Sequence, residues 1–212
     1  MTPARGRLVA LEGVDGSGKS TQARILAESI GAVLTFEPGA TEFGRTLRRL
    51  LLDPGNPVPA VRAEALLVAA DRAQHVAEVI RPALEGGRVV VTDRFSGSTL
   101  AYQGYGRGIP IAELRTLVEW AAGGVEPDLT VVVDVPLDVA RRRIEHPAPD
   151  RLERLDEGFF SRVRDGYLEL ASQDRSRWAV VEGDADVEAV AAVIRGVVEQ
   201  RLGVVPIQER PA

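Results

Sequence analysis

The sequence predicts an α/β protein of three layers, in which helices cover both faces of a five-stranded parallel sheet. Short runs rich in valine alternate with longer segments of helical periodicity. Such alternation is typical of parallel sheets built from strand–helix–strand units. Two of the runs, around Val89–Val91 and Val131–Val133, are continuously apolar. This pattern is expected of strands that are buried on both faces.

The expected elements follow in a regular order. The strands are residues 8–11, 33–36, 89–92, 129–135 and 178–181, each a short apolar or β-branched run. The helices are residues 19–30, 42–52, 60–85, 110–123, 136–145, 157–173 and 186–202, each with amphipathic or broadly apolar spacing. No repeat or long linker interrupts this order. We therefore expect a single domain over residues 1–205 and a flexible tail over residues 206–212.

The composition excludes several classes of protein. With 45% hydrophobic and 27% charged residues, the chain resembles neither a disordered nor a membrane protein. Its apolar runs are far shorter than the ~20 residues of a membrane span, and the first residues lack the apolar segment of a signal peptide. Absence of cysteine excludes disulfides and thiolate metal sites. These features predict a cytoplasmic protein without a membrane association.

Charge and histidine content narrow the function further. The net charge of −5 argues against a broad nucleic-acid-binding surface. Two isolated histidines, His75 and His146, make a His-rich metal site or a Ser-His-Asp triad a poor hypothesis. Of the 26 basic residues, only Lys19 is a lysine. This bias toward arginine suggests a G+C-rich genome, and it directs attention to the position of the one lysine.

Lys19 lies in a glycine-rich phosphate-binding loop. The expected ATP-binding residues are Gly13, Val14, Asp15, Gly16, Ser17, Gly18, Lys19, Ser20 and Thr21, and the first eight fit the pattern G-x-x-x-x-G-K-[ST]. The loop stands between an expected strand and an expected helix, where its backbone N–H groups can bind phosphate oxygens. Lys19 can reach the β- and γ-phosphates as a flexible point charge. A glycine-rich turn with a solvated lysine is the alternative, and the strand–loop–helix context argues against it. The predicted architecture is therefore a P-loop fold.

Not every class of P-loop protein fits. A guanine-binding switch uses an Asn-Lys-x-Asp motif, which this chain cannot supply because Asn56 precedes a proline and Lys19 is already assigned. Motor and remodelling ATPases are normally larger. A small P-loop protein rich in arginine favours a kinase that acts on a small phosphorylated acceptor.

Six segments together resemble bacterial thymidylate kinases (dTMP kinases). They are Glu12–Thr21, Phe36–Arg48, Ala69–His75, Asp93–Gly104, Pro127–Asp134 and Arg164–Leu170. The most diagnostic is Asp-Arg-Phe followed by Leu-Ala-Tyr-Gln-Gly, and the resemblance extends over about residues 7–202. It implies transfer of the γ-phosphoryl group of ATP to dTMP, which gives ADP and dTDP for dTTP synthesis. It also implies Mg²⁺ as cofactor and a homodimeric enzyme.

The resemblance assigns roles to several charged residues. Asp93, at the end of a buried strand, would bind Mg²⁺ together with Ser20, partly through water. Arg94, Arg72 and Arg48 would bind the acceptor phosphate, for which guanidinium groups are well suited. The alternatives are a helix N-cap for Asp93 and solvated helix faces for the arginines.

The remaining acceptor residues would surround the nucleoside. Thr99 and Gln103 match positions that contact the thymine edge, and Tyr102 matches the residue that crowds the 2′ side of the sugar, although a core aromatic is its alternative. Asp15 resembles the carboxylate that binds the 3′-hydroxyl. Glu37 begins the Glu-Pro turn at the acceptor pocket, and the sequence leaves open whether that peptide is cis.

A further segment, residues 146–156, resembles the mobile lid of these kinases. The phosphate loop contains no arginine, whereas Arg151 occupies the lid position, so the chain resembles the lid-arginine type. Arg151 would neutralise charge on the transferred phosphoryl group. The expected catalytic set is thus Lys19, Asp93, Arg94 and Arg151. The attacking atom is a phosphate oxygen, so the reaction needs no side-chain nucleophile.

Three residues depart from the family pattern. Val68 stands where an aromatic ring usually stacks on thymine, Phe36 replaces an arginine before Glu-Pro, and Gly97 replaces an acidic residue. Val68 in particular leaves open a related nucleoside monophosphate kinase with another base preference. A non-catalytic nucleotide-binding regulator is a second alternative. Against it, each expected catalytic residue is present.

Overall fold

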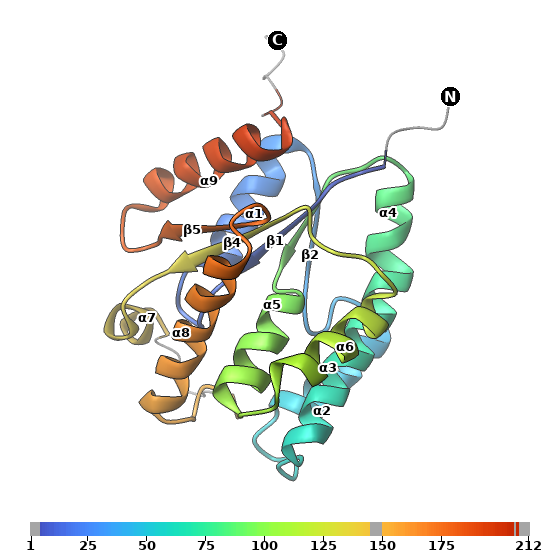
Figure 1. Cartoon of the computed structure of the whole chain (residues 1–212), viewed down its shortest axis with the longest axis vertical. Coiled ribbons are helices and arrows are strands. Elements are labelled where there is room, and N and C mark those ends of the chain that lie inside the picture. Colours follow the sequence, from blue (N-terminus) through green and yellow to red (C-terminus); the bar gives the residue numbers. More distant parts are fainter. Residues whose placement is uncertain (1–4, 145–149, 206, 208–212) are drawn as a thin grey trace.

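The computed structural model describes residues 5–144, 150–205 and 207. These form three layers, in which one parallel sheet lies between two layers of helices (Figure 1). The strands are β1 (Leu8–Glu12), β2 (Val33–Phe36), β3 (Val90–Asp93), β4 (Leu129–Asp134) and β5 (Trp178–Glu182). Their order in the sheet is β2-β3-β1-β4-β5, and every neighbouring pair is parallel. The predicted five-stranded parallel sheet is confirmed.

Helices cover both faces of this sheet. They are α1 (Lys19–Ile30), α2 (Glu42–Leu52), α3 (Val61–His75), α4 (Arg81–Glu85), α5 (Ser96–Thr99), α6 (Ile111–Ala122), α7 (Leu137–Arg143), α8 (Glu157–Gln173) and α9 (Val187–Leu202), with π-helical turns η1 (Val76–Ile80) and η2 (Leu100–Gly106). Two of the helices, α1 and α9, pack on one face against the side chains of β1, β3 and β4. On the opposite face, η1, α4 and α6 cover β1 and β3, while α7, α8 and η2 cover β4.

The expected strands and helices agree closely with the observed ones, with one omission. The expected helix 60–85 is a continuous helical segment made of α3, η1 and α4. The segment from α5 to η2, residues 96–106, was not expected to be helical, because glycines and small polar residues give it no apolar stripe. It forms because Leu100–Gly104 are buried on all sides between α3, α6 and α8. Its last turn is wide, with the Arg107 N–H donating to the Tyr102 carbonyl five residues earlier.

Strand register determines where the functional residues gather. Leu11 of β1 pairs with Asp93 of β3, and Phe36 of β2 pairs with the same Asp93. The residues that follow these strands therefore leave the sheet at one carboxyl edge. In open α/β sheets, ligands bind in the crevice outside this edge.

Parts of the predicted lid and tail lie outside the described residues. These parts are residues 146–149 of the predicted lid and residues 206 and 208–212 of the predicted tail, and residue 145 of the expected helix 136–145 also lies outside the described residues. Within the part of the chain that the structure describes, no helix has both the length and the apolar character needed to cross a membrane.

Candidate functional site

The phosphate-binding loop connects β1 to α1 and leaves the N-terminus of α1 open to an anion. Gly18 caps the helix with φ 92°, and neither a capping side chain nor an acidic residue in the first turn competes for its N–H groups. A Cβ on Gly16, where φ is 80°, would lie 2.1 Å from the Ala140 carbonyl oxygen. These glycines are therefore required by backbone conformation and by close packing. Residues Gly16 to Thr21 line one cavity.

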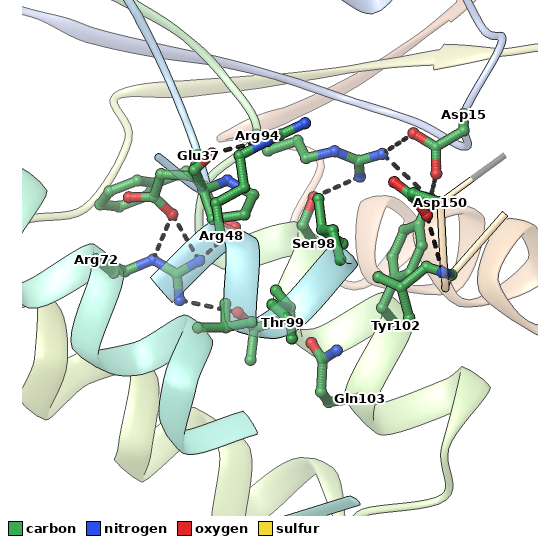
Figure 2. A pocket seen from close by; sticks show the side chains of 16 residues that line it. Asp15, Glu37, Arg48, Arg72, Arg94, Ser98, Thr99, Tyr102, Gln103 and Asp150 are labelled. Atoms are coloured by element: carbon green, nitrogen blue, oxygen red, sulfur yellow. Dashed lines mark hydrogen bonds and ion pairs between the residues drawn. The ribbon is translucent and has the colours of Figure 1, made fainter. Parts of the chain in front are cut away.

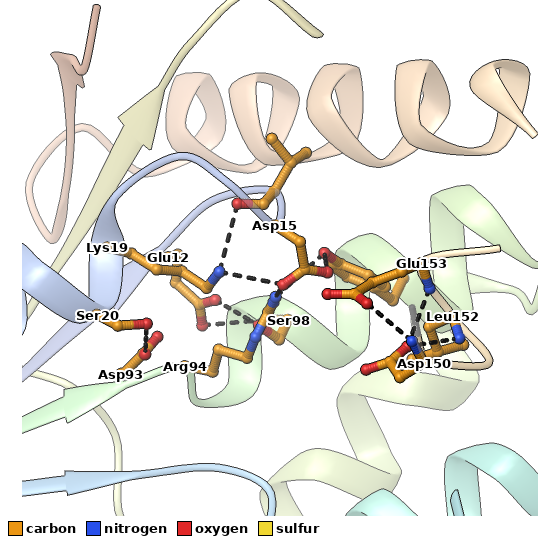
Figure 3. Close-up of polar contacts among 12 residues, drawn as sticks. Glu12, Asp15, Lys19, Ser20, Asp93, Arg94, Ser98, Asp150, Leu152 and Glu153 are labelled. Atoms are coloured by element: carbon orange, nitrogen blue, oxygen red, sulfur yellow. Dashed lines mark hydrogen bonds and ion pairs between the residues drawn. The ribbon is translucent and has the colours of Figure 1, made fainter. Parts of the chain in front are cut away.

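Lys19 lies across the inside of this loop (Figure 3). Its Nζ donates to the Val14 carbonyl and to Asp15 Oδ1, both at 3.3 Å, and the residue is only 5% exposed. Burial, with the nearby charge of Arg94 second, lowers the pKa of Lys19 from its ordinary value. Both contacts of the ammonium group are long and therefore weak. Phosphate oxygens that enter the cavity can replace them.

Ser20 and Asp93 meet on the other side of the loop. The Ser20 hydroxyl donates to Asp93 Oδ2, while Asp93 Oδ1 is buried and has no hydrogen-bond partner. Within the described residues, no three His, Asp or Glu side chains cluster as a metal site. One carboxylate with a free oxygen and one hydroxyl fit Mg²⁺, which keeps several waters and binds substrate phosphates rather than a full protein cage.

Arg94 connects the phosphate loop to a second pocket. It follows β3 with φ 71°, a conformation that side chains other than glycine rarely adopt. It donates to Asp15, to Ser98 Oγ at 3.0 Å and to the Tyr102 hydroxyl at 3.2 Å, and its guanidinium lies 4.9 Å from the centre of the Tyr102 ring. Although burial raises the pKa of Asp15, the charges of Arg94 and Lys19 hold it below its ordinary value. Asp15 and Arg94 therefore form a partly buried ion pair that joins the phosphate loop to the second pocket.

Glu12, to which no sequence motif assigned a role, lies close to Arg94 and binds the residues that follow it. Glu12 is fully buried at the end of β1 and accepts hydrogen bonds from Phe95 N and Ser98 N, both at 3.0 Å, and from Ser98 Oγ at 2.6 Å. The Tyr167 hydroxyl donates to it at 3.1 Å, and burial raises its pKa. A Cβ on Gly97 would lie 2.8 Å from Glu12 Oε1, which explains the absence of a side chain there. The sequence could have pointed to Glu12, because an acidic residue at the end of a buried apolar strand is unusual unless it has buried partners.

All nine predicted acceptor residues line the second pocket (Figure 2). They are Asp15, Glu37, Arg48, Val68, Arg72, Arg94, Thr99, Tyr102 and Gln103. They come from the phosphate loop, the β2–α2 turn, α2, α3, the residue after β3, α5 and η2. The structure thus brings together residues that are 88 positions apart in the chain, between Asp15 and Gln103. Phe36 does not line this pocket, and its side chain is 44% exposed.

Arg72 and Glu37 form the floor of the pocket. Arg72 is fully buried, and its Nε and NH2 donate to Glu37 Oε2 at 3.0 and 2.8 Å. Its NH1 donates to Thr99 Oγ1 at 2.9 Å and its NH2 to the Phe95 carbonyl at 2.8 Å. The Glu37–Pro38 peptide, which the sequence left open, is cis. Arg48 donates to the Pro38 carbonyl at 2.8 Å from the outer side.

Arg151 contacts α2 and α3, on the acceptor side of the molecule. Its Nε donates to the Leu51 carbonyl at 2.7 Å, and both terminal nitrogens lie 3.2 Å from Glu64 Oε2. Neither Glu64 nor this contact was anticipated from the sequence, since Glu64 is one of 31 acidic residues and belongs to no motif. The predicted contact of Arg151 with the transferred phosphoryl group stays a prediction.

Arg143 is a further residue at the phosphate loop that had no specific role assigned. Its NH1 donates to the Gly183 carbonyl at 3.0 Å, and it lines the same cavity as Lys19 and Ser20. Val187 also lines this cavity. The only feature of the sequence that could have pointed to Arg143 is the run of three arginines at residues 141–143.

Comparison with known proteins agrees with this geometry. The family model for thymidylate kinase matches residues 11–194. Two curated relatives, the thymidylate kinases of Desulforudis audaxviator and Bifidobacterium longum, are each 45% identical to the chain, over 195 and 203 residues. These alignments cover 89% and 92% of this chain and 88% and 98% of the relatives.

A solved structure, thymidylate kinase from Ehrlichia chaffeensis, superposes with a TM-score of 0.76 at 30% identity. The match covers 92% of this chain and 99% of the other. The family model spans most of the chain, and the relatives exceed 40% identity over nearly their whole length. This chain belongs to the thymidylate kinase family.

Proposed function

We propose that this protein transfers the γ-phosphoryl group of ATP to dTMP, giving ADP and dTDP on the way to dTTP. One observation carries the proposal: the phosphate loop and the acceptor pocket meet at the Asp15–Arg94 pair, so that both substrates converge on one point. A kinase needs this convergence, because phosphoryl transfer depends mainly on alignment and charge neutralisation.

On the donor side, the loop N–H groups, the N-terminus of α1 and Lys19 would bind the phosphates of ATP. Ser20 and the free oxygen of Asp93 would hold Mg²⁺, which neutralises phosphate charge when bound. Arg143 and Val187 line the same cavity and would contact the nucleoside of ATP. Lys19, Ser20, Arg143 and Val187 all line this cavity.

On the acceptor side, Arg94 and Arg48 would bind the phosphate of dTMP. Charge-assisted bonds of this kind are roughly twice as strong as neutral ones. Asp15 would accept from the 3′-hydroxyl, and Tyr102, whose hydroxyl donates to Asp15 Oδ2 at 2.9 Å, would crowd a ribose 2′-hydroxyl. The resulting selection of deoxyribose would be steric.

The base would lie deeper, beside Thr99 and Gln103. Arg72 has five N–H donors, of which its contacts with Glu37, Phe95 and Thr99 use four. The remaining N–H, next to Thr99, suits a base carbonyl better than the acceptor phosphate expected from the resemblance. Val68 supplies apolar contact in place of an aromatic ring.

We further propose that the enzyme is a cytoplasmic homodimer. The exposed side of α3 and η1 carries Leu66, Ala70, Ala73 and Ala77, spaced by four, three and four residues, and Leu66 is 59% exposed. Neighbouring α2 and α6 add the exposed Phe43 and Trp120. A helix face of small and apolar residues suits close packing against a second copy.

Acceptor specificity tests the proposed reaction. Purified protein is assayed with ATP and Mg²⁺ against dTMP, dUMP, UMP, dCMP, AMP and GMP. We expect dTMP to give the highest kcat/KM. Preference for another nucleotide would instead support a kinase of shifted base preference. Nucleotide binding without any turnover would support the regulator alternative.

A further inference from the structure

Glu64, in the first turn of α3, connects Gln103 of the acceptor pocket to two arginines, Arg107 and Arg151. It is 1% exposed. Gln103 Nε2 donates to its Oε1 at 2.9 Å, and Arg107 donates to Oε1 at 3.2 Å and to Oε2 at 3.0 Å. Arg151 donates to Oε2 at 3.2 Å. Glu64 itself does not line the acceptor pocket, whereas Gln103 does.

This arrangement determines which way round the Gln103 amide is held. A carboxylate between two guanidinium groups only accepts hydrogen bonds, so the amide NH₂ must face Glu64. The amide carbonyl is thereby turned away from Glu64. Figure 2 shows the amide of Gln103 directed into the pocket beside Thr99. The reverse orientation would set the carbonyl oxygen against the buried carboxylate and leave the NH₂ without this partner.

The pocket therefore presents a defined hydrogen-bonding pattern to a base. Gln103 offers an acceptor, and the remaining Arg72 N–H with the Thr99 hydroxyl offers donors. Thymine and uracil complement this pattern with N3–H and an adjacent carbonyl. Cytosine presents an acceptor at N3 and an amino group at C4, so both of its groups would be mismatched.

We propose that Glu64 is a positioning residue that sets base selectivity by holding the Gln103 amide in one orientation. This inference rests on the proposed dTMP kinase function and concerns the same pocket. Glu64 does not touch the base. It acts through Gln103, and the preference for thymine over cytosine follows from the fixed acceptor that Gln103 presents.

The variant Glu64→Gln tests this role. Its neutral amide can donate or accept, so Gln103 can turn over and present its NH₂ to N3 of cytosine. We expect the ratio of kcat/KM for dTMP to that for dCMP to fall at least tenfold. This ratio separates base reading from phosphoryl transfer, because any effect through Arg151 acts on both acceptors alike.

Two controls distinguish positioning from general damage to the buried cluster. Arg107→Met removes a partner of the same carboxylate but keeps the Glu64–Gln103 bond, so the ratio should stay within twofold of the wild type. In a Gln103→Met background, Glu64→Gln should leave the ratio unchanged, since the group through which it acts is gone. A folded Glu64→Gln protein with wild-type selectivity, or an equal loss in Arg107→Met, would overturn the proposal.

The outcome is separable from that of the proposed function. Wild-type protein that fails to prefer dTMP contradicts the function, whereas strong preference retained in Glu64→Gln contradicts only the role of Glu64. If Glu64→Gln does not fold, a dTMP-bound crystal structure of the wild type decides. Gln103 bridging Glu64 and N3 supports the inference, and Gln103 turned away from Glu64 refutes it.

Discussion

At the scale of single residues, the site consists of charges removed from water and matched to specific partners. Asp15 lies between Lys19 and Arg94, and Glu37 between Arg72 and His75. Leaving one member of such a pair unmatched is strongly destabilising when the pair is buried. Two buried carboxylate oxygens of the described residues, Asp93 Oδ1 and Asp71 Oδ2, have no hydrogen-bond partner.

Replacing Lys19 with methionine tests the phosphate loop. We expect turnover to fall by roughly 10³-fold or more, by analogy with other phosphoryl-transfer groups. The fold should persist, because Lys19 makes only two contacts of 3.3 Å. Steady-state kinetics and thermal unfolding measure the two effects. Near-normal turnover in the folded variant would exclude the role of Lys19.

Asp71 predicts a pH-dependent stability. It is buried, its Oδ1 accepts from Gly39 N at 2.9 Å and its Oδ2 has no partner. Burial, followed by the charge of Glu37, raises its pKa to about 6. Because the pKa of Asp71 is higher in the folded than in the unfolded protein, the protonated carboxyl stabilises the fold. This stabilisation is fully present below about pH 4 and is lost as the pH rises through 6. It amounts to up to about 3 kcal/mol.

The variant Asp71→Asn should lack this dependence. Its free energy of unfolding in urea, relative to wild type, should rise between pH 4 and pH 7.5. The exposed Asp165→Asn provides a matched control and should keep the wild-type profile. Parallel profiles for wild type and Asp71→Asn would show that Asp71 is ionised throughout this range.

At the scale of elements, sequence patterns predicted what depends on local signals and missed what depends on tertiary contacts. The strands and the phosphate loop carry β-branched runs and glycines at fixed spacing. The helical segment 96–106 carries no such period, because most of it is buried and it presents polar side chains to the pocket. Glu12, Glu64 and Arg143 act through partners 39 to 155 residues away, and no local pattern marks them.

The segment around Arg151 is tested by Arg151→Ala. We expect kcat to fall with little change in KM for dTMP, because a group that acts on the transferred phosphoryl contributes mainly in the transition state. Glu64 keeps Gln103 and Arg107, so the fold should survive. Arg142→Ala, at an exposed position of α7, should behave as wild type. A change confined to KM for dTMP would instead assign Arg151 to the acceptor side, where it lies in this structure.

At the scale of the whole molecule, the two faces of the sheet differ in what covers them. The face with α3 and α6 exposes Leu66 and Trp120, whereas α9 on the other face exposes Val193. Light scattering after size exclusion should give a dimer for the wild type and a monomer for Leu66→Glu. Val193→Glu, the same chemistry on the opposite face, should remain dimeric. A monomeric wild type, or a dimeric Leu66→Glu, would contradict the proposed interface.

Because the chain has one lysine, the rate of cleavage after that lysine can report local unfolding of the phosphate loop. A lysine-specific protease can cut this sequence only after Lys19, which is the first residue of α1 and 5% exposed. Cleavage therefore requires local unfolding of the loop and the first turn of α1. A nucleotide bound there stabilises the closed form by RT ln(1 + [L]/Kd). The rate of a single backbone cut thus measures how tightly each nucleotide holds the loop, without labels and without turnover.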